Sequence, residues 1–524
     1  MEVLLNTAIF VKIFCMKFIV SCTALLLSFN SWSQTNQMNY SLDLTQSQDT
    51  FLVSLSFAEK LQKDQDIFQF AATAPGTYQT MNIGRLVSDF KAYDKKGKEI
   101  TTIFTAPNQY QLTKPQKISK ITYRVAETFD TPLKEFPIYL MCGSSIEEDH
   151  TLINAHTVMG YIHGLQKIPF NVSITHDEAW KIGTALQSEN GTYRATDFDH
   201  LVDSPILLGD LTFADTTIAG SAVEIFTYSK SGKITSQLLL DNMSDMLDAS
   251  RKFLVELPVD RYTFLYFFEP NLNGQTGAWE HSYSSEYVLN EKEPSPDYMS
   301  KVTDIASHEF FHIVTPLNIH SEVIETFNFV NPTPSIHLWL YEGVTEWASN
   351  ILLYRGELVD LETYLGNSVA QKIYVDNNYF NKEWSLKKLA QESFTEKGSK
   401  QYGNIYYRGS LIAGLLDILL LDKSDGTYGL RELMLDLIKK YGKGNPFSEE
   451  TFIEDLTNMT YPEIDDFFKN YVMDNQALPY KDYLDKIGLQ LIDSGGKISI
   501  RKRNKLSDRQ KHLFDAWSKN LPLD

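Results

Sequence analysis

The chain has 524 residues and a formal net charge of −19 at pH 7. This length is too great for a single hydrophobic core, so more than one domain is expected. The excess of acidic residues argues against nucleic acid and anionic membranes as partners. The sequence contains no internal repeat and no low-complexity segment.

The first 33 residues are predicted to be a signal peptide. Lys17 is followed by an apolar run at residues 18–29 and by small residues before Gln34. This is the order of segments in a cleavable secretory signal, and its proportions are ordinary if translation starts at Met16. Cys22 matches a lipid-attachment site only loosely. We therefore expect export to the periplasm or the extracellular space, and a lipid anchor at Cys22 is the less favoured alternative.

Only Cys142 of the three cysteines lies beyond the predicted signal peptide. The mature chain therefore cannot form an internal disulfide, and a lone cysteine is usually a small core residue. No other apolar stretch is predicted to span a membrane, because the most apolar one, residues 411–421, has only the length of a buried helix.

The periodicity of apolar residues predicts an α+β multidomain protein. Residues 34–205 alternate as strands do and are expected to form a β-rich domain, with a turn at Pro75-Gly76. Residues 206–478 are expected to form a catalytic domain, in which strands dominate to about residue 295 and helices follow. Residues 479–524 remain as a C-terminal tail. The expected helices of the second lobe are 361–375, 410–421, 430–441, 448–456 and 461–472.

His308-Glu309-Phe310-Phe311-His312 is an HExxH pattern within a predicted helix at residues 296–314. Residues four apart lie about 40° apart around a helix, so both imidazoles can bind one ion. Glu309 can take a proton from a water that such an ion activates. The alternative is a pair of surface histidines on an amphipathic helix, which the apolar surroundings disfavour.

The third ligand is predicted by elimination. A short spacing would need glycine and then histidine soon after the motif, where Thr315 and Asn318 stand. A common longer spacing would place a glutamate near residues 331–332, which are Asn and Pro. Glu322 and Glu325 are close in sequence, but their segment has no clear helical pattern.

Glu342 lies early in a strong helical pattern at residues 338–353. Glu346 is one turn later on the same face, where it either hydrogen-bonds a ligand histidine or is a solvated helix acid. Zinc bound by three protein side chains keeps one position open for water. The sequence thus predicts one Zn²⁺ per chain, held by His308, His312 and Glu342.

The HEFFH string, followed by Trp339-Leu340-Tyr341-Glu342-Gly343, resembles the glycyl aminopeptidase family, metallopeptidase family sixty-one. Two more segments resemble the family's N-terminal region, at residues 70–78 (FAATAPGTY) and 197–205 (DFDHLVDSP). The resemblance runs from about residue 38 to 480. It implies a thermolysin-like gluzincin catalytic domain and a preference for small N-terminal residues such as glycine and alanine.

The resemblance also implies further site residues. Gly277-Ala278-Trp279-Glu280-His281 occupies the place of the family's exopeptidase motif, so Gly277 and Glu280 would bind substrate, Glu280 through the free α-amine. Tyr406 would donate a hydrogen bond to the oxyanion, with Tyr402 a weaker candidate. The implied function is a zinc aminopeptidase acting on peptides. The alternatives are a zinc endopeptidase of broader specificity and a non-catalytic peptide-binding relative.

The chain departs from the family in two places. Residues 313–320 lack the basic run that usually follows HExxH, and His320 is their one potential cation. The segment after Pro479 is too short for the C-terminal PDZ domain that many relatives carry, so none is expected.

Overall fold

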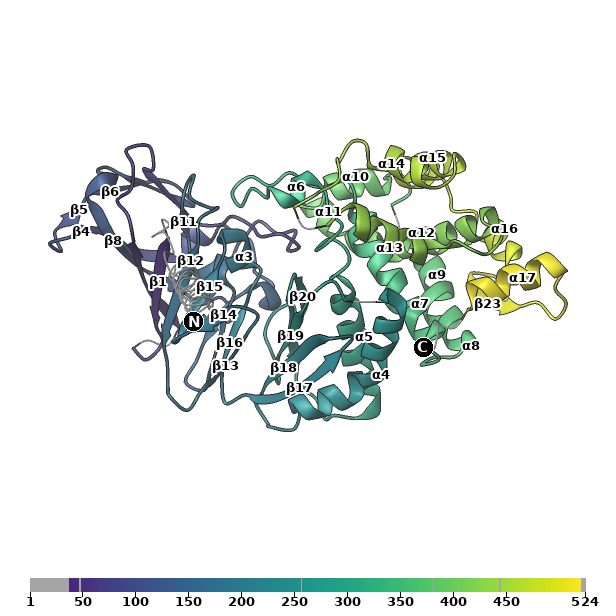
Figure 1. Ribbon diagram of the computed structural model, residues 1–524, viewed down its shortest axis with the longest axis horizontal. Coiled ribbons are helices and arrows are strands. Elements are labelled where there is room, and N and C mark those ends of the chain that lie inside the picture. Colours follow the sequence, from purple (N-terminus) through teal and green to yellow (C-terminus); the bar gives the residue numbers. More distant parts are fainter. Residues whose placement is uncertain (1–36, 47–48, 256, 380, 443, 520–524) are drawn as a thin grey trace, which may run out of the picture.

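The computed structural model describes residues 37–46, 49–255, 257–379, 381–442 and 444–519. A β-rich N-terminal part and a helical C-terminal part lie side by side, and strands β17 to β21 lie between them (Figure 1). The α+β architecture expected from the sequence is thereby confirmed. The predicted signal peptide, Met16 and Cys22 lie outside the described residues.

An eight-stranded sheet is the largest layer of the N-terminal part, in the order β14-β15-β12-β1-β2-β8-β4-β5. Alternate residues of β1 and β2 are buried, so one face of this sheet covers a hydrophobic core. The strands are β1 (Met38–Asp43), β2 (Thr50–Phe57), β4 (Val87–Asp94), β5 (Glu99–Ile100), β8 (Ile118–Ala126), β12 (Phe170–Thr175), β14 (Gln187–Glu189) and β15 (Thr192–Ala195).

Two four-stranded sheets complete this part, in the orders β13-β16-β10-β9 and β11-β3-β7-β6. Their strands are β3 (Ile67–Gln69), β6 (Thr102–Ala106), β7 (Gln109–Leu112), β9 (Ser145–Ile146), β10 (His150–Ile153), β11 (Tyr161–Ile162), β13 (Lys181–Thr184) and β16 (Ile206–Gly209). The connections contain η1 (Ile83–Leu86), η2 (Pro115–Lys117), η3 (Leu140–Cys142), α2 (Ala155–Val158) and α3 (Phe198–Val202).

A five-stranded sheet, β17-β18-β19-β21-β20, joins the two parts. Its central strand is buried on both faces: Phe264 and Tyr266 belong to the core of the helical lobe, whereas Leu265 and Phe267 pack against the N-terminal part. The sheet therefore holds both parts in a fixed relation. The strands are β17 (Thr212–Ile218), β18 (Ser221–Ser229), β19 (Arg261–Glu269), β20 (Gly277–His281) and β21 (Ser284–Asn290).

The prediction that strands dominate residues 210–295 is wrong for one long segment. Helix α4 (Ser236–Leu254) crosses between β18 and β19, which pair in parallel. Parallel neighbours need such a crossover, and Leu239, Met243 and Leu247 bury one face of it. The Thr235 hydroxyl accepts a hydrogen bond from the Leu238 backbone amide and fixes where the helix begins.

The helical lobe begins with α5 (Pro296–Phe311), which is three residues shorter than predicted because His312 is its C-cap. The predicted helix at 338–353 is a π-helical turn, η4 (Trp339–Val344), that continues into α7 (Thr345–Arg355). The other elements are α6 (Glu322–Glu325), α8 (Leu361–Thr363), η5 (Tyr364–Ala370), α9 (Gln371–Asn378), α10 (Leu386–Gln391), α11 (Glu396–Ser399), α12 (Gly403–Lys423), α13 (Leu430–Lys440), α14 (Phe452–Met459), α15 (Glu463–Phe468) and η6 (Lys469–Met473).

The C-terminal segment packs onto this lobe. It contains α16 (Tyr480–Lys486), the hairpin of β22 (Leu489–Ser494) and β23 (Lys497–Lys502), and α17 (Asp508–Trp517). Phe514 and Trp517 are buried in the lobe's core, and the Arg355 guanidinium donates to the Trp517 carbonyl. Within the described residues, α12 alone has the length and hydropathy of a membrane span, and most of it is buried inside the protein.

Candidate metal centre and substrate cleft

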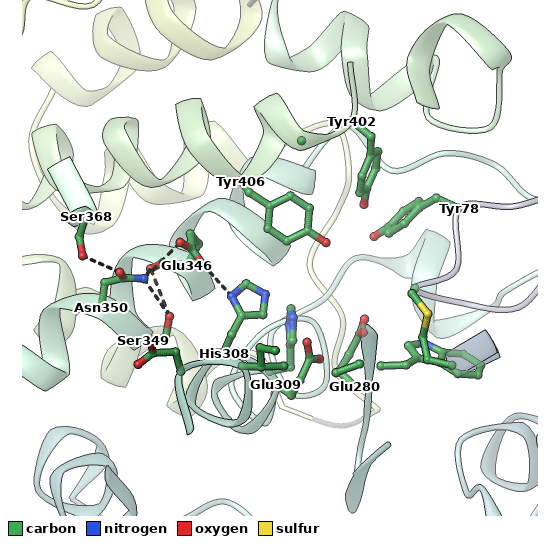
Figure 2. A pocket seen from close by; sticks show the side chains of 18 of the residues that line it. Tyr78, Glu280, His308, Glu309, Glu346, Ser349, Asn350, Ser368, Tyr402 and Tyr406 are labelled. Carbon is green, nitrogen blue, oxygen red and sulfur yellow. Dashed lines mark hydrogen bonds and ion pairs between the residues drawn. The ribbon is translucent and has the colours of Figure 1, made fainter. Parts of the chain in front are cut away.

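A cavity of about 900 Å³ lies where the N-terminal part, the five-stranded sheet and the helical lobe meet. Figure 2 shows its lining side chains, with His308 and Glu309 in the middle. Tyr78 reaches it from the N-terminal part, Glu280 from β20, and Tyr406 from α12. The cavity is therefore built only when all three parts are folded together.

His308 and His312 line this cavity and form a compact group with the buried Glu342. One ligand atom from each lies within 4.8 Å of the other two. The Glu342 Oε2 atom is 3.7 Å from His308 Nε2 and 3.6 Å from His312 Nε2. These separations are too long for hydrogen bonds and suit three atoms that face a common point.

The outer contacts of both histidines leave their inner nitrogens free. His308 Nδ1 donates to Glu346 Oε2 at 2.9 Å, and His312 Nδ1 donates to the Thr315 carbonyl at 2.9 Å. Each Nε2 atom then keeps its lone pair for a metal. Glu342 Oε2 is buried and has no hydrogen-bond partner. This donor set fits a Zn²⁺ ion, because a buried carboxylate oxygen without a partner needs a cation.

A close helix crossing brings Glu342 to the histidines. A Cβ atom at Gly343 would lie 2.5 Å from the Gly409 Cα atom, so η4 and α12 touch through their backbones. The same contact sets Tyr406, one turn before Gly409, beside the metal site. Glu342 itself lies on a π-helical turn, a feature that is frequent at functional sites.

Glu346 contacts a ligand histidine, as one of the two sequence interpretations expected. Its other oxygen, Oε1, is held at 2.7 Å by Lys372 Nζ and at 3.2 Å by Asn350 Nδ2. Burial opposes ionisation, but Lys372 and His308 hold the pKa of Glu346 well below its usual range. Lys372 is buried and also donates to the Ser410 hydroxyl. The sequence offered no signal for Lys372, because it lies on α9, distant from the motif along the chain.

Three carboxylates crowd the inner face of the cavity. Oxygens of Glu280 and Glu309 lie within 4.8 Å of each other and of a His312 nitrogen. Burial raises the pKa of Glu309 to about 7. Burial, Glu342 and Glu309 raise the pKa of Glu280 well above its usual value. The neighbouring carboxylates thus oppose one another's ionisation, and a bound cation would relieve this repulsion.

Tyr406 lies over the metal site and Tyr402 lies further from it. The Tyr406 ring centre is 5.6 Å from that of His308, and burial and the nearby Glu342 carboxylate raise the pKa of the Tyr406 phenol well above its usual value. The Tyr402 ring instead packs on Tyr78 at 4.9 Å. Tyr406, the tyrosine that the resemblance implied, is thus placed beside the candidate metal ligands, and the weaker candidate Tyr402 is not (Figure 2).

Gly277, His320 and Cys142 are not among the three candidate metal ligands. Gly277 does not line the cavity, whereas Met141 does. The Met141 side chain packs against Gly277, where an added Cβ would be 3.0 Å from Met141 Cε. His320 is paired with Glu325 at 2.6 Å, and both residues line a separate cavity of about 190 Å³. Cys142 is a free, buried thiol that belongs to the N-terminal core, as expected, and also lines the catalytic cavity.

Comparisons with known proteins agree with this geometry. Residues 39–210 match the model of the M61 peptidase N-terminal domain, and residues 301–412 match that of the M61 glycyl aminopeptidase. The sequence matches none of the curated proteins closely enough to count as a relative.

Solved structures share the fold at low sequence identity. An aminopeptidase N family protein from Idiomarina loihiensis is 20% identical, with a TM-score of 0.76 over 90% of this chain and 82% of that one. A variant of an M1 zinc metallopeptidase from Deinococcus radiodurans is 13% identical, with a TM-score of 0.52 over 85% and 94% of the two chains. Yeast LTA4 hydrolase is 12% identical, with a TM-score of 0.52 over 86% and 70%.

Proposed function

Because this chain belongs to the M61 glycyl aminopeptidase family of metallopeptidases, we propose that it is a zinc-dependent aminopeptidase. It removes one residue at a time from the N-terminus of a peptide, and it prefers small residues such as glycine or alanine. The observation that carries this proposal is the position of Glu280. Its carboxylate lies within 4.8 Å of both Glu309 and His312. A substrate whose carbonyl is at the metal site would therefore have its α-amine beside a carboxylate.

His308, His312 and Glu342 would hold the Zn²⁺ ion. When bound, zinc supplies Lewis-acid chemistry, because it polarises a carbonyl and acidifies water. Glu309 is one residue from His308 and faces the same space, so it takes the proton of the attacking water and passes it to the leaving amine.

Two further side chains orient the substrate. Glu280 pairs with the α-ammonium group and so fixes which peptide bond reaches Glu309. The Tyr406 phenol, held over the His308 ring, donates a hydrogen bond to the oxygen on which negative charge develops. Both contacts follow from the chemistry of the groups that line the cavity.

A comparison of free and N-acetylated alanyl substrates tests the proposal. The zinc-loaded protein should hydrolyse alanine p-nitroanilide, and Glu280→Ala should lower kcat/KM for it by at least about a hundredfold, since a buried charge pair is lost. Equal hydrolysis of free and blocked substrates by the wild-type protein would instead support the endopeptidase. One zinc per chain with no hydrolysis of a peptide panel would support the non-catalytic relative.

Export of the protein is part of the proposal and rests on the N-terminal sequence alone. Mature protein recovered from outside the cytoplasm should begin at Gln34. Intact Met1 or Met16 at the N-terminus of that material would contradict it.

A further inference from the structure

The segment from Pro75 to Tyr78 separates two cavities. The catalytic cavity of about 900 Å³ lies on one side, and a cavity of about 190 Å³ lies on the other. Gly76, Tyr78 and Glu280 line both. The smaller cavity is also lined by residues of the 197–205 segment, so both N-terminal segments that resemble the family meet there.

The backbone of this segment lies directly against the proposed amine-binding carboxylate. A Cβ at Gly76 would be 2.6 Å from Glu280 Oε1 and 2.7 Å from Trp279 Nε1. Gly76 has a φ of +77°, which favours glycine. No atom of a substrate fits between this glycine and Glu280, so a peptide cannot continue past the carboxylate on that side.

Internal hydrogen bonds fix the segment in place. The Thr77 hydroxyl donates to the Ala74 carbonyl at 2.8 Å and contacts the Thr73 hydroxyl at 3.2 Å. Tyr78 follows with a φ of 47°, an uncommon conformation for a large side chain. Backbone strain of this kind persists where the surrounding structure over-determines it, and it clusters at functional sites.

The Tyr78 ring crosses from the N-terminal part to the helical lobe. It packs on Tyr402 at 4.9 Å and on Phe394 at 6.0 Å between ring centres. Figure 2 shows its hydroxyl directed toward the space above Glu280. Tyr78 and Glu280 lie on one side of His308, and Asn350 and Ser368 lie on the other.

We propose that Pro75–Tyr78 is a wall that limits this enzyme to the removal of one residue, with the Tyr78 ring as the part that excludes any group attached to the substrate's amine. The inference rests on the proposed function. Glu280 then selects a charged amine by electrostatics, whereas the wall rejects longer chains by volume. The N-terminal part thereby determines specificity although the metal ligands all belong to the helical lobe.

The two modes of selection respond differently to substitution. Removal of the Tyr78 ring joins the two cavities, so an N-acetyl group gains space beyond Glu280. Glu280→Ala removes the charge but leaves the wall. This variant should therefore lose activity on the free-amine substrate and gain little activity on the N-acetylated substrate. Hydrophobic volume alone typically discriminates by about 10- to 200-fold.

The test measures kcat/KM for alanine p-nitroanilide and for N-acetyl-alanine p-nitroanilide. Zinc-loaded full-length Tyr78→Ala is compared with Phe104→Ala, which removes an exposed aromatic ring of the same part. The acetylated-to-free ratio should rise at least about tenfold in Tyr78→Ala and stay unchanged in Phe104→Ala. Tyr78→Leu, which keeps an apolar contact with Phe394, should give a smaller rise and carries the test if Tyr78→Ala does not fold.

The proposal that Pro75–Tyr78 acts as a wall would be refuted by a Tyr78 variant with normal zinc content and melting temperature whose acetylated-to-free ratio of kcat/KM stays within about twofold of wild type. A gain on the blocked substrate in Glu280→Ala equal to that in Tyr78→Ala would also overturn it, because charge alone would then explain the selection. A zinc-loaded wild-type protein that cleaves neither substrate would refute the proposed function itself, and the wall with it.

Discussion

Replacement of Lys372 by methionine removes the ammonium that holds Glu346 while leaving every metal ligand intact. Lys372 Nζ is 2.7 Å from Glu346 Oε1, and Glu346 Oε2 in turn accepts the hydrogen bond of His308 Nδ1. Without Lys372, the remaining contact to Oε1 is Asn350 Nδ2 at 3.2 Å. The carboxylate would be held less firmly, and the ring of His308 with it.

The expected loss of zinc affinity follows from the number of contacts that still hold Glu346 and His308. Loss of an outer partner of a metal ligand usually costs 10- to 100-fold in metal affinity, or about 1.4–2.7 kcal/mol. Lys372→Met keeps Glu346 and its contact with His308, so a loss of about tenfold in zinc affinity is expected. Glu346→Ala removes the carboxylate entirely and should approach a hundredfold.

The assay is a competition titration of the zinc-free protein against a coloured zinc chelator. Lys400→Met is the matched control, because Lys400 forms an exposed pair with Glu396 and neither residue lines the catalytic cavity. Lys372→Met added to Glu346→Ala should cost nothing further, since the lysine acts through that carboxylate. Equal zinc affinity in the Lys372 and Lys400 variants, or a full additional loss in the double variant, would refute the reasoning.

The remaining predictions concern the base, the helix crossing and pH. Glu309→Gln should keep one zinc per chain and lower kcat about a hundredfold to ten-thousandfold, and unchanged kcat would exclude it as the base. Gly409→Ala should lower the free energy of unfolding, measured in urea, by about 1–3 kcal/mol, because its Cβ would lie 2.8 Å from Gly343 Cα. Gly414→Ala on the same helix is the control, since its Cβ would make only ordinary van der Waals contacts. Burial lowers the pKa of His156 from 6.5 to about 3 in the folded protein. Between these two pH values the unfolded chain binds a proton at His156 and the folded protein does not. The neutral, buried His156 therefore leaves the free energy of unfolding at its full value above about pH 6.5 and lowers it as the pH falls. Zinc-free wild type should therefore lose up to about 1.4 kcal/mol per pH unit more than His156→Leu between pH 6.5 and 5, and parallel curves would contradict this.

Short-range patterns were enough to predict the two histidines of the metal site. His308 and His312 lie on one face of a helix because of their spacing, whatever the rest of the fold does. Glu342 could be selected because alternative spacings lacked a suitable side chain and its own segment had a helical pattern. These predictions depended on contacts within single elements or on a resemblance in short motifs.

Helix α4 shows where such patterns are insufficient. Its buried residues have helical spacing, but they lie between strand-like segments, and the requirement for a crossover follows only from the parallel pairing of β18 with β19. The folded C-terminal segment is a similar case, since its burial depends on a partner surface formed by α7, α12 and η5. The position of Gly277 behind Met141 also depends on a contact between distant segments.

The sequence by itself determined the family of the protein and predicted which side chains would hold a metal, because those features depend on fixed spacings along one helix or on short motifs. The tertiary structure alone decided that Lys372 supports Glu346, that Gly343 and Gly409 let η4 and α12 touch, and that Tyr78 reaches the cleft from the N-terminal part. Each of these contacts joins segments far apart in the chain. Their geometry is set by the packing of the N-terminal part, the five-stranded sheet and the helical lobe around one cavity, and no local periodicity encodes it.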